Sequence, residues 1–196
     1  MRIISGLARG RTLCSPGQSK TIRPTADRAK EAIFSIIGER IISALVLDLF
    51  AGTGALGLEA WSRGAKQVVF VDHQAKALEL IKKNCLACLQ NMAPSPEEAL
   101  IILRHDLRRG LDLNFGKKTI PPFFDFIFLD PPYSQGLAEE TLKNIDKSDL
   151  CGPKTLIIAE ESSGEILPDD FSHLILSDRR RYGDTAFWFY TVKETK

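Results

Sequence analysis

Two short motifs in this sequence have the residue types and spacing of a group-transfer site. The segment DLFAGTGALG at residues 48–57 carries glycines at positions 52, 54 and 57, the G-x-G-x-x-G spacing that lets a backbone approach a cofactor closely. The segment DPPY follows at residues 130–133. Each motif comes directly after an apolar run, so we expect both at the carboxyl ends of strands, where open α/β sheets bind ligands.

The acids near the glycine motif indicate which cofactor it holds. Asp72 lies twenty residues after Gly52, where an acid accepts hydrogen bonds from ribose hydroxyls, and this pattern alone fits NAD as well as other adenosine cofactors. Asp48 would repel the pyrophosphate of a dinucleotide but attract the ammonium and sulfonium groups of S-adenosylmethionine. No Lys or Arg occurs in residues 44–62. The loop therefore favours S-adenosylmethionine over NAD, and a purely structural turn would leave both acids without a role.

The DPPY motif has the acceptors and the flat surface that a nucleobase amine requires. Pro131 and Pro132 fix the backbone and lack N–H groups, so carbonyl oxygens face a pocket without competing donors. Asp130 adds a carboxylate acceptor, and a base can stack on Tyr133. Held in this way, the amine nitrogen can attack a methyl carbon in line with the sulfonium. A simple Asp-Pro-Pro turn is the alternative, but the shared sheet position with the glycine loop favours catalysis.

The elements that must position these motifs follow from apolar periodicity. Buried strands are predicted at 45–49, 67–71, 100–103, 124–129 and 155–159, and a closing antiparallel pair at 174–176 and 186–192. Helices are predicted at 25–37, with Thr25 as N-cap, and at 55–63, 74–90 and 137–145. This alternation predicts a doubly wound, Rossmann-like α/β fold whose mostly parallel sheet has helices on both faces. Residues 2–4 and 11–13 are predicted as the arms of a preceding basic β-hairpin.

Length and composition limit the class of protein. The 196 residues, 44% hydrophobic and 26% charged, suit one soluble domain, which we divide into a basic arm at 1–24 and a catalytic domain at 25–196. The sequence contains neither a membrane-length apolar run nor the apolar core of a signal peptide. Its four cysteines are too few and scattered for a disulfide scaffold, so they are interpreted as reduced thiols. We therefore expect a cytoplasmic monomer.

Charge is unevenly distributed along the chain. Residues 1–30 hold seven Lys or Arg against one Asp, a balance of +6, while the remainder carries −5. A basic arm on a mildly acidic body suits a polyanion held at one edge of a catalytic domain, because phosphate contacts supply sequence-independent affinity. A solvated terminus with no partner is the other interpretation of this segment.

Several other features are assigned structural roles. Cys85 and Cys88 share the apolar stripe of a predicted helix, which indicates buried thiols, since a zinc site needs further ligands. The three histidines do not cluster, and methyl transfer to an amine needs no metal. The aromatic run at 187–190 is interpreted as strand core. For the arginines at 179–181, phosphate contact and a solvated strand end are equally compatible with the sequence.

Together these motifs carry a family resemblance. The glycine loop, VVFVD, DPPY, RIISGLARGR, TIRPTADRAKEAIF and RRYGDTAFWFY resemble the bacterial 16S ribosomal RNA guanine-N2 methyltransferases, within the class I S-adenosylmethionine-dependent methyltransferases. The resemblance implies a seven-stranded sheet, with Asp72 at the ribose and Asp106 near the adenine amine. His73 departs from the acid or polar group often seen after that aspartate. The implied donor pocket comprises Asp48, Phe50, Ala51, Gly52, Thr53, Gly54, Asp72, His73, Asp106 and Leu107.

The resemblance also implies the substrate. Residues Asp130, Pro131, Pro132 and Tyr133 would hold a guanine of small-subunit ribosomal RNA that is flipped from its stack. The Pro131 carbonyl and Asp130 would orient its N2 amine, and either Asp130 or water would take the proton released. The RNA, free or within the small ribosomal subunit or its assembly intermediate, would contact basic and polar residues near the N-terminus, namely Arg9, Arg11, Arg23, Thr25 and Arg28.

Three other functions remain compatible with parts of the sequence. A DNA adenine-N6 methyltransferase uses the same tetrapeptide, but the 63 residues after Tyr133 leave little room for a DNA-reading domain. A protein-glutamine methyltransferase fits the basic arm poorly. A non-catalytic RNA-binding or ribosome-assembly module would not require an intact DPPY motif.

Overall fold

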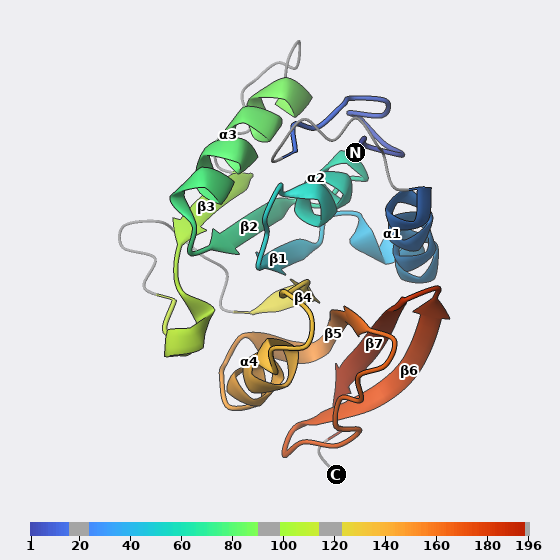
Figure 1. The fold of residues 1–196 in the computed structure, drawn as a ribbon, viewed down its shortest axis with the longest axis vertical. Coiled ribbons are helices and arrows are strands. Elements are labelled where there is room, and N and C mark those ends of the chain that lie inside the picture. Colours follow the sequence, from blue (N-terminus) through green and yellow to red (C-terminus); the bar gives the residue numbers. More distant parts are fainter. Residues whose placement is uncertain (16–23, 90–98, 114–122, 195–196) are drawn as a thin grey trace.

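Seven strands form a single sheet in the computed structural model, which describes residues 1–15, 24–89, 99–113 and 123–194 (Figure 1). The spatial order is β3-β2-β1-β4-β5-β7-β6. Strands β1 to β5 are parallel, and β7 runs antiparallel between β5 and β6. The predicted Rossmann-like sheet is therefore confirmed, including its antiparallel end. The strands span Leu45–Leu49 (β1), Gln67–Asp72 (β2), Leu100–Arg104 (β3), Phe124–Leu129 (β4), Cys151–Ser162 (β5), Leu174–Tyr182 (β6) and Thr185–Val192 (β7).

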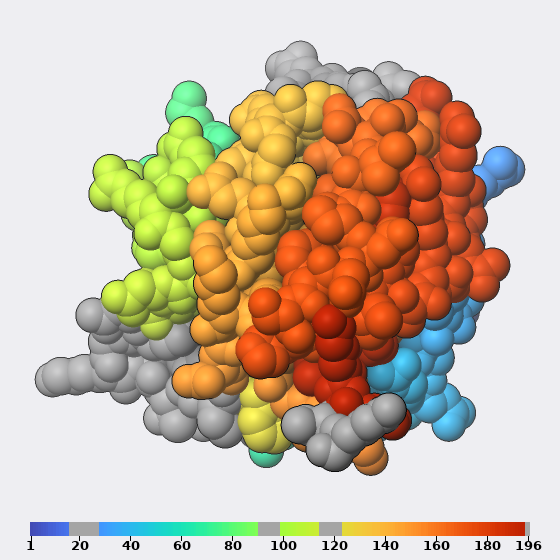
Figure 2. Space-filling model, turned by 90° about the horizontal axis from the view of Figure 1, so that it is seen from below, coloured from blue at the N-terminus to red at the C-terminus, as the bar shows by residue number. Residues whose placement is uncertain are grey.

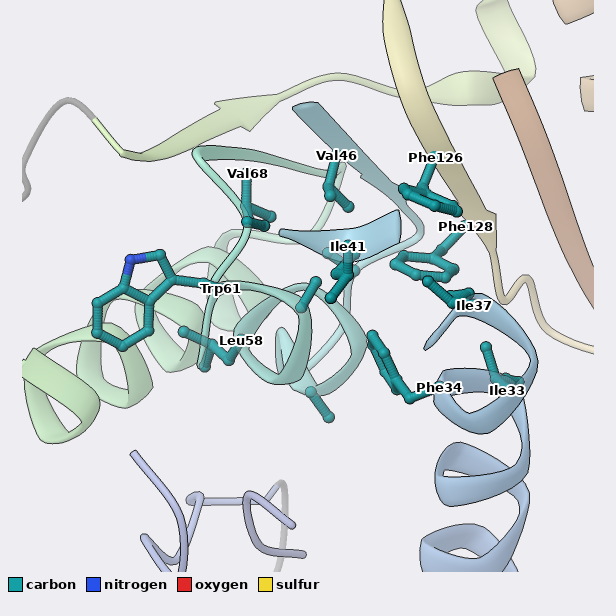
Figure 3. Packing of buried hydrophobic residues seen from close by; sticks show 14 of the residues in the cluster. Ile33, Phe34, Ile37, Ile41, Val46, Leu58, Trp61, Val68, Phe126 and Phe128 are labelled. Atoms are coloured by element: carbon teal, nitrogen blue, oxygen red, sulfur yellow. The ribbon is translucent and has the colours of Figure 1, made fainter. Parts of the chain in front are cut away.

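Helices cover both faces of this sheet and create two apolar cores (Figure 1). One face carries α1 (Pro24–Ile37), α2 (Ala55–Ser62) and α3 (Ala75–Leu89), and the other carries α4 (Leu137–Asp146). Two short 3₁₀ helices, η1 (Gly38–Ile41) and η2 (Leu107–Arg109), complete the elements. In Figure 3, Phe34 of α1 lies toward Phe128 of β4, with ring centroids 5.9 Å apart. This packing fixes α1 beside the carboxyl end of the central strands.

The strand order brings the two sequence motifs together. Strand β1 pairs with β2 on one side and with β4 on the other, and Leu49 aligns with Leu129 at their carboxyl ends. The Asp130 N–H donates to the Leu49 carbonyl at 3.5 Å, which joins the first residue of DPPY to the strand before the glycine loop. Ligands bind at such a switch point in open α/β sheets.

Some predicted boundaries are wrong for local physical reasons. Helix α1 begins at Pro24, so Thr25 lies inside the helix and not at its N-cap; proline is favoured in a first helical turn because its φ is preset and its missing N–H costs nothing there. Strand β5 begins at Cys151, well before the predicted position 155. The Thr155 hydroxyl accepts from the Gly152 N–H and donates to the Phe124 carbonyl, so it connects β5 to β4 where the pairing register shifts. Gly152 and Pro153 in this part of β5 are residues that sequence patterns do not favour in strands.

The N-terminal segment packs on the domain without forming strands. The arms predicted for the β-hairpin pair only briefly: Arg2 and Thr12 form an antiparallel bridge, with the Ile3 N–H donating to the Arg11 carbonyl and the Leu13 N–H to the Met1 carbonyl, each at 3.0 Å. Apolar side chains from this segment, Ile3, Ala8 and Leu13, are buried in the core under α1 and α2. Gly6 has φ +82°, and a Cβ there would lie 1.7 Å from the Ser62 carbonyl oxygen. The segment therefore contacts α2 so closely that only glycine fits at this position.

The C-terminal strands complete the second core. The aromatic run 187–190 is fully buried within β7, as predicted. Strand β6 extends to Tyr182, beyond the predicted residue 176, because pairing with β7 continues through the exposed arginines of this edge strand. Figure 2 shows the face built largely from α4 and the chain between β5 and β6.

Both Cys85 and Cys88 are buried, as predicted. None of the helices in the described ranges is long and apolar enough to span a membrane.

Candidate active site

A cavity of about 630 Å³ opens at the carboxyl ends of β1, β4 and β5. Both sequence motifs reach it, α1 forms one wall, and the turn between β6 and β7 forms another. Of the predicted site residues, seven line the cavity: Asp48, Phe50, Ala51, Gly52, Thr53, Asp130 and Tyr133. The other lining residues are Met1, Ala29, Lys30, Ile33, Ala55, Leu56, Glu160, Asp184, Thr185 and Phe187.

The glycine loop owes its shape to backbone angles that few residues adopt. Phe50, Gly52 and Gly54 all have φ between +54° and +75°, and a non-glycine residue such as Phe50 in this region stores strain of the kind found at ligand sites. A Cβ on Gly57 would lie 2.4 Å from the Phe70 ring and 2.9 Å from the Asp48 carboxylate. Glycine at 57 thus lets α2 pack directly on β1 and β2.

Asp48 lies at the base of the cavity as a buried acid. Only 2% of its surface is exposed, and its Oδ2 accepts the Gly57 N–H at 2.9 Å. Burial raises the pKa of Asp48 to about 7, opposed by the Gly57 hydrogen bond and reinforced by the charge of Asp72. A cation bound in the cavity would relieve this cost, because an opposite charge stabilises the ionised carboxylate.

The residues predicted for the adenosine end lie outside the cavity. Asp72, at the end of β2, accepts the Gly52 N–H at 3.0 Å and the Gln74 N–H at 2.8 Å, so it also holds the glycine loop. The neighbouring His73 ring lies 3.6 Å from the same carboxylate. Gly54 is likewise absent from the lining. The ribose contact expected of Asp72 therefore stays a prediction.

Asp106 follows β3 and is engaged by a neighbour. Its two carboxylate oxygens accept from the Nε and Nη2 atoms of Arg108, each at 2.8 Å, and it caps the 3₁₀ helix η2. The hydrogen bond from Arg108 is the main reason that its pKa falls to about 2. Leu107 is buried in the core. Asp106 is thus an ionised acceptor, and its contact with adenine is untested.

The DPPY segment presents its first and last residues to the cavity. Asp130 is exposed and lines the cavity. Neither proline is among the described lining residues: Pro131 is buried, and Pro132 is exposed. The Tyr133 hydroxyl donates to Glu160 and lies 3.1 Å from the Thr185 Oγ1, so β5 and β7 together fix the ring. Tyr133 is 38% exposed and lines the cavity.

Asp130 combines desolvation by the surrounding protein with several acidic neighbours. Protein surrounds the cavity, and this desolvation raises the pKa of Asp130 well above its ordinary value; the charges of Glu160, Asp48 and Glu161 raise it further. Burial likewise raises the pKa of Glu160. A carboxylate with a raised pKa has a higher affinity for a proton than an ordinary aspartate does.

Sequence reasoning missed Lys30 and Glu160 in this site. Glu160 directly follows the predicted strand 155–159, so the strand-end criterion that identified Asp48 and Asp130 would have found it. Lys30 had no comparable signal, because it lies on a helix whose cavity-facing side depends on how α1 packs.

Of the predicted RNA residues, Arg9, Arg11 and Arg28 are not among the described residues that line the cavity. Arg9 and Arg28 are exposed, and Arg11 is partly buried. Thr25 lies in the first turn of α1, and Arg23 lies outside the described residues. Of the arginines at 179–181, Arg180 pairs with Asp178 at 2.8 Å and Arg179 stacks on Trp188 at 4.0 Å. An RNA-binding role for any of these residues stays a prediction.

Comparison with known proteins gives consistent results over nearly the whole chain. A family model described as Conserved hypothetical protein 95 matches residues 1–191. Ribosomal RNA small subunit methyltransferase D of Haemophilus influenzae is 37% identical over 89% of this chain and 86% of its own. A candidate rRNA methyltransferase of Bacillus subtilis is 35% identical over 97% and 98%.

Solved structures share the fold. A candidate methyltransferase from Escherichia coli superposes with a TM-score of 0.79 at 28% identity, covering 98% of both chains. A more distant candidate methyltransferase, solved in complex with S-adenosylhomocysteine, has a TM-score of 0.58 at 17% identity and covers 87% of this chain and 50% of its own. The latter likeness concerns the fold alone.

Proposed function

The chain belongs to the family described as Conserved hypothetical protein 95, and from this membership and its cavity we propose that it methylates the exocyclic N2 amine of a guanine in small-subunit ribosomal RNA, with S-adenosylmethionine as donor. One observation carries the proposal: Asp48, near the carboxyl end of β1, and Asp130, directly after β4, line a single cavity. The first acid suits a cationic donor, and the second suits an amine acceptor. The relatives named for small-subunit rRNA methylation support the substrate class.

The charges of the cavity fit this donor better than a phosphate-bearing cofactor. Among the described residues that line it are four acids, Asp48, Asp130, Glu160 and Asp184, and one lysine. A pyrophosphate would be repelled there, whereas the donor ammonium and sulfonium would be attracted. Asp48 and the backbone of the glycine loop would hold the methionine portion, and Asp72 beside that loop would reach the ribose.

The chain itself handles the amine and its proton. The bound donor supplies an electrophilic methyl group. Asp130 accepts one N2 hydrogen of the guanine, and the Pro131 carbonyl accepts the other, while the base stacks on Tyr133. The methyl carbon bonds to N2 as its bond to the donor sulfur breaks, and the N2 hydrogen that was bonded to Asp130 then passes to that carboxylate as a proton. The raised pKa of that carboxyl favours Asp130 over bulk water as the acceptor.

Labelled methyl transfer tests the proposal directly. Small-subunit rRNA from cells that lack this protein is incubated with the protein and methyl-labelled S-adenosylmethionine, and the product nucleosides are identified by mass. N2-methylguanosine is the expected product. Label in DNA adenine would instead favour the adenine-N6 alternative, and no label in either nucleic acid would favour a binding module.

We further propose that the basic residues of the arm and of the adjoining start of α1, within residues 1–30, provide affinity for RNA phosphates. Charge reversal at the exposed Arg9 and Arg28 should weaken rRNA binding and reduce the slope of log affinity against log salt by about 1 for each phosphate that the variant no longer binds. Reversal at Lys147, an exposed residue after α4, is the matched control and should change neither quantity. Filter binding over a salt series measures both, and equal slopes for all proteins would refute the role of the arm.

Asp48 should make donor binding pH-dependent. Because its pKa is raised to about 7, Asp48 is mostly neutral at about pH 6 and mostly ionised at about pH 8, and only the ionised form attracts the donor ammonium. Affinity for S-adenosylhomocysteine should therefore rise up to about tenfold over this interval. Titration calorimetry measures the change. Asp48→Asn should bind more weakly at high pH and lose the dependence; an unchanged pH profile in this variant would assign the titration to another group.

A further inference from the structure

Lys30 is a buried cation that faces the candidate donor site. It lies on α1 with 5% of its surface exposed and lines the cavity. Its Nζ donates to the Arg2 carbonyl at 2.6 Å and lies 3.3 Å from the Glu59 carboxylate. A buried lysine with a carboxylate partner is often purely structural. Whether Lys30 can also bind an anionic ligand depends on whether its partner carboxylate neutralises its charge completely.

Glu59 does not cancel the charge of Lys30. The same carboxylate also pairs with Arg63, whose Nε lies 2.7 Å away. It accepts the Ile4 and Ser5 N–H groups as well, at 2.8 and 3.0 Å. Two cations thus share one carboxylate, and this cluster keeps a net charge of +1 beside the cavity. Lys30 is the member of this cluster that lines the cavity, so an anionic group bound there would interact with the Lys30 ammonium.

Among the residues described as lining the cavity, Lys30 is the sole lysine or arginine. The methionine portion of the proposed donor is a zwitterion, so its ammonium can approach Asp48 while its carboxylate is repelled by the four acids of the lining. A cation among the lining residues would offset this repulsion. We propose that Lys30 binds the carboxylate of the donor methionine portion, and this assignment rests on the proposed function.

Two product-like ligands separate this role from a structural one. S-adenosylhomocysteine carries the amino acid portion, whereas 5′-methylthioadenosine has the same adenosine and thioether without it. Lys30→Met should weaken S-adenosylhomocysteine binding by about 10- to 100-fold, since the variant cannot form the hydrogen-bonded ion pair with the ligand carboxylate. Binding of 5′-methylthioadenosine should be unaltered within about twofold. Titration calorimetry on the full chain gives both constants, and Lys30→Arg should restore most of the missing affinity.

The possible failures point to different causes. Equal losses for both ligands would mean that Lys30 only supports the fold, and no loss for either would remove it from the site; both results overturn the inference. If the wild-type protein binds neither ligand, the proposed donor itself is wrong. Should the methionine variant not fold, as judged by circular dichroism, Lys30→Gln keeps an amide donor toward the Arg2 carbonyl without the charge, and the same selective loss is expected.

Discussion

Replacing Asp130 with alanine should lower kcat for methyl transfer by about 10³-fold, the range expected when a positioned proton acceptor is removed. Asp130 faces the cavity at the end of β4, within the segment that the Leu49 carbonyl anchors. The alanine variant keeps this backbone but loses both the acceptor for the amine hydrogen and the destination for its proton. Affinity for S-adenosylhomocysteine should change by less than about twofold, because the donor contacts lie on other elements.

Asp130→Asn distinguishes the two tasks of this carboxylate. Asparagine still accepts a hydrogen bond through its amide oxygen but cannot take a proton at neutral pH. If Asp130 takes the proton, the asparagine variant should be nearly as slow as alanine, and the acid limb of the wild-type pH profile should vanish. That limb should lie above the ordinary carboxyl range, since desolvation by the protein around the cavity and nearby acids raise the pKa of Asp130 and activity requires its ionised form.

Single-turnover rates across a pH series measure both effects, and calorimetry with S-adenosylhomocysteine provides the control for donor binding. Tyr133→Phe is the matched variant within the same motif: it keeps the stacking ring and removes only the hydroxyl that binds Glu160. Its rate should fall far less than that of either Asp130 variant. An asparagine variant that retains most of the wild-type rate would show that water, and not Asp130, takes the proton.

The part of the site that sequence reasoning predicted consists of residues at the carboxyl ends of strands or directly after them. Asp48 and Asp130 follow apolar runs, and a parallel sheet brings the carboxyl ends of β1 and β4 side by side whatever the details of packing. The glycine loop is similarly local, because its left-handed angles demand glycine at particular positions. Such features depend on neighbours in the chain, so a sequence pattern can reveal them.

Features that depend on contacts between distant segments escaped prediction. Lys30 reaches the cavity only because α1 packs on β4 through Phe34 and Phe128. Residues 1–3 and 10–13 do pair as the predicted hairpin arms, but the pairing is short, and the next N–H groups, of Ile4 and Ser5, donate to the Glu59 carboxylate of α2. Nothing in the spacing of these residues encodes that partner. The adenosine contact predicted for Asp72 rests on its spacing from the glycine loop, and that of Asp106 rests on family resemblance; both residues lie outside the described cavity lining.

Glu59 connects the N-terminal segment, α1 and α2, so its removal should cost more stability than any surface change. Its carboxylate is fully buried and receives the Ile4 and Ser5 N–H groups, Arg63 and Lys30. A glutamine has one acceptor oxygen, and its amide hydrogens would face donors. Glu59→Gln thus leaves buried cations and N–H groups without partners, and breaking such a buried pair costs about 3–5 kcal/mol.

Urea unfolding of the Glu59→Gln variant should therefore show a loss of about 3–5 kcal/mol in the free energy of unfolding with an unchanged slope. Glu139→Gln is the matched control: it breaks the exposed i,i+4 pair with Lys143, worth about 0.5 kcal/mol or less. Hydrogen exchange adds a local measurement, since the Ile4 and Ser5 amides should lose protection before the sheet does. A Glu59→Gln variant as stable as the Glu139 control would mean that the N-terminal segment docks through its apolar side chains alone. In that case the Arg2 carbonyl alone would position the Lys30 ammonium beside the cavity.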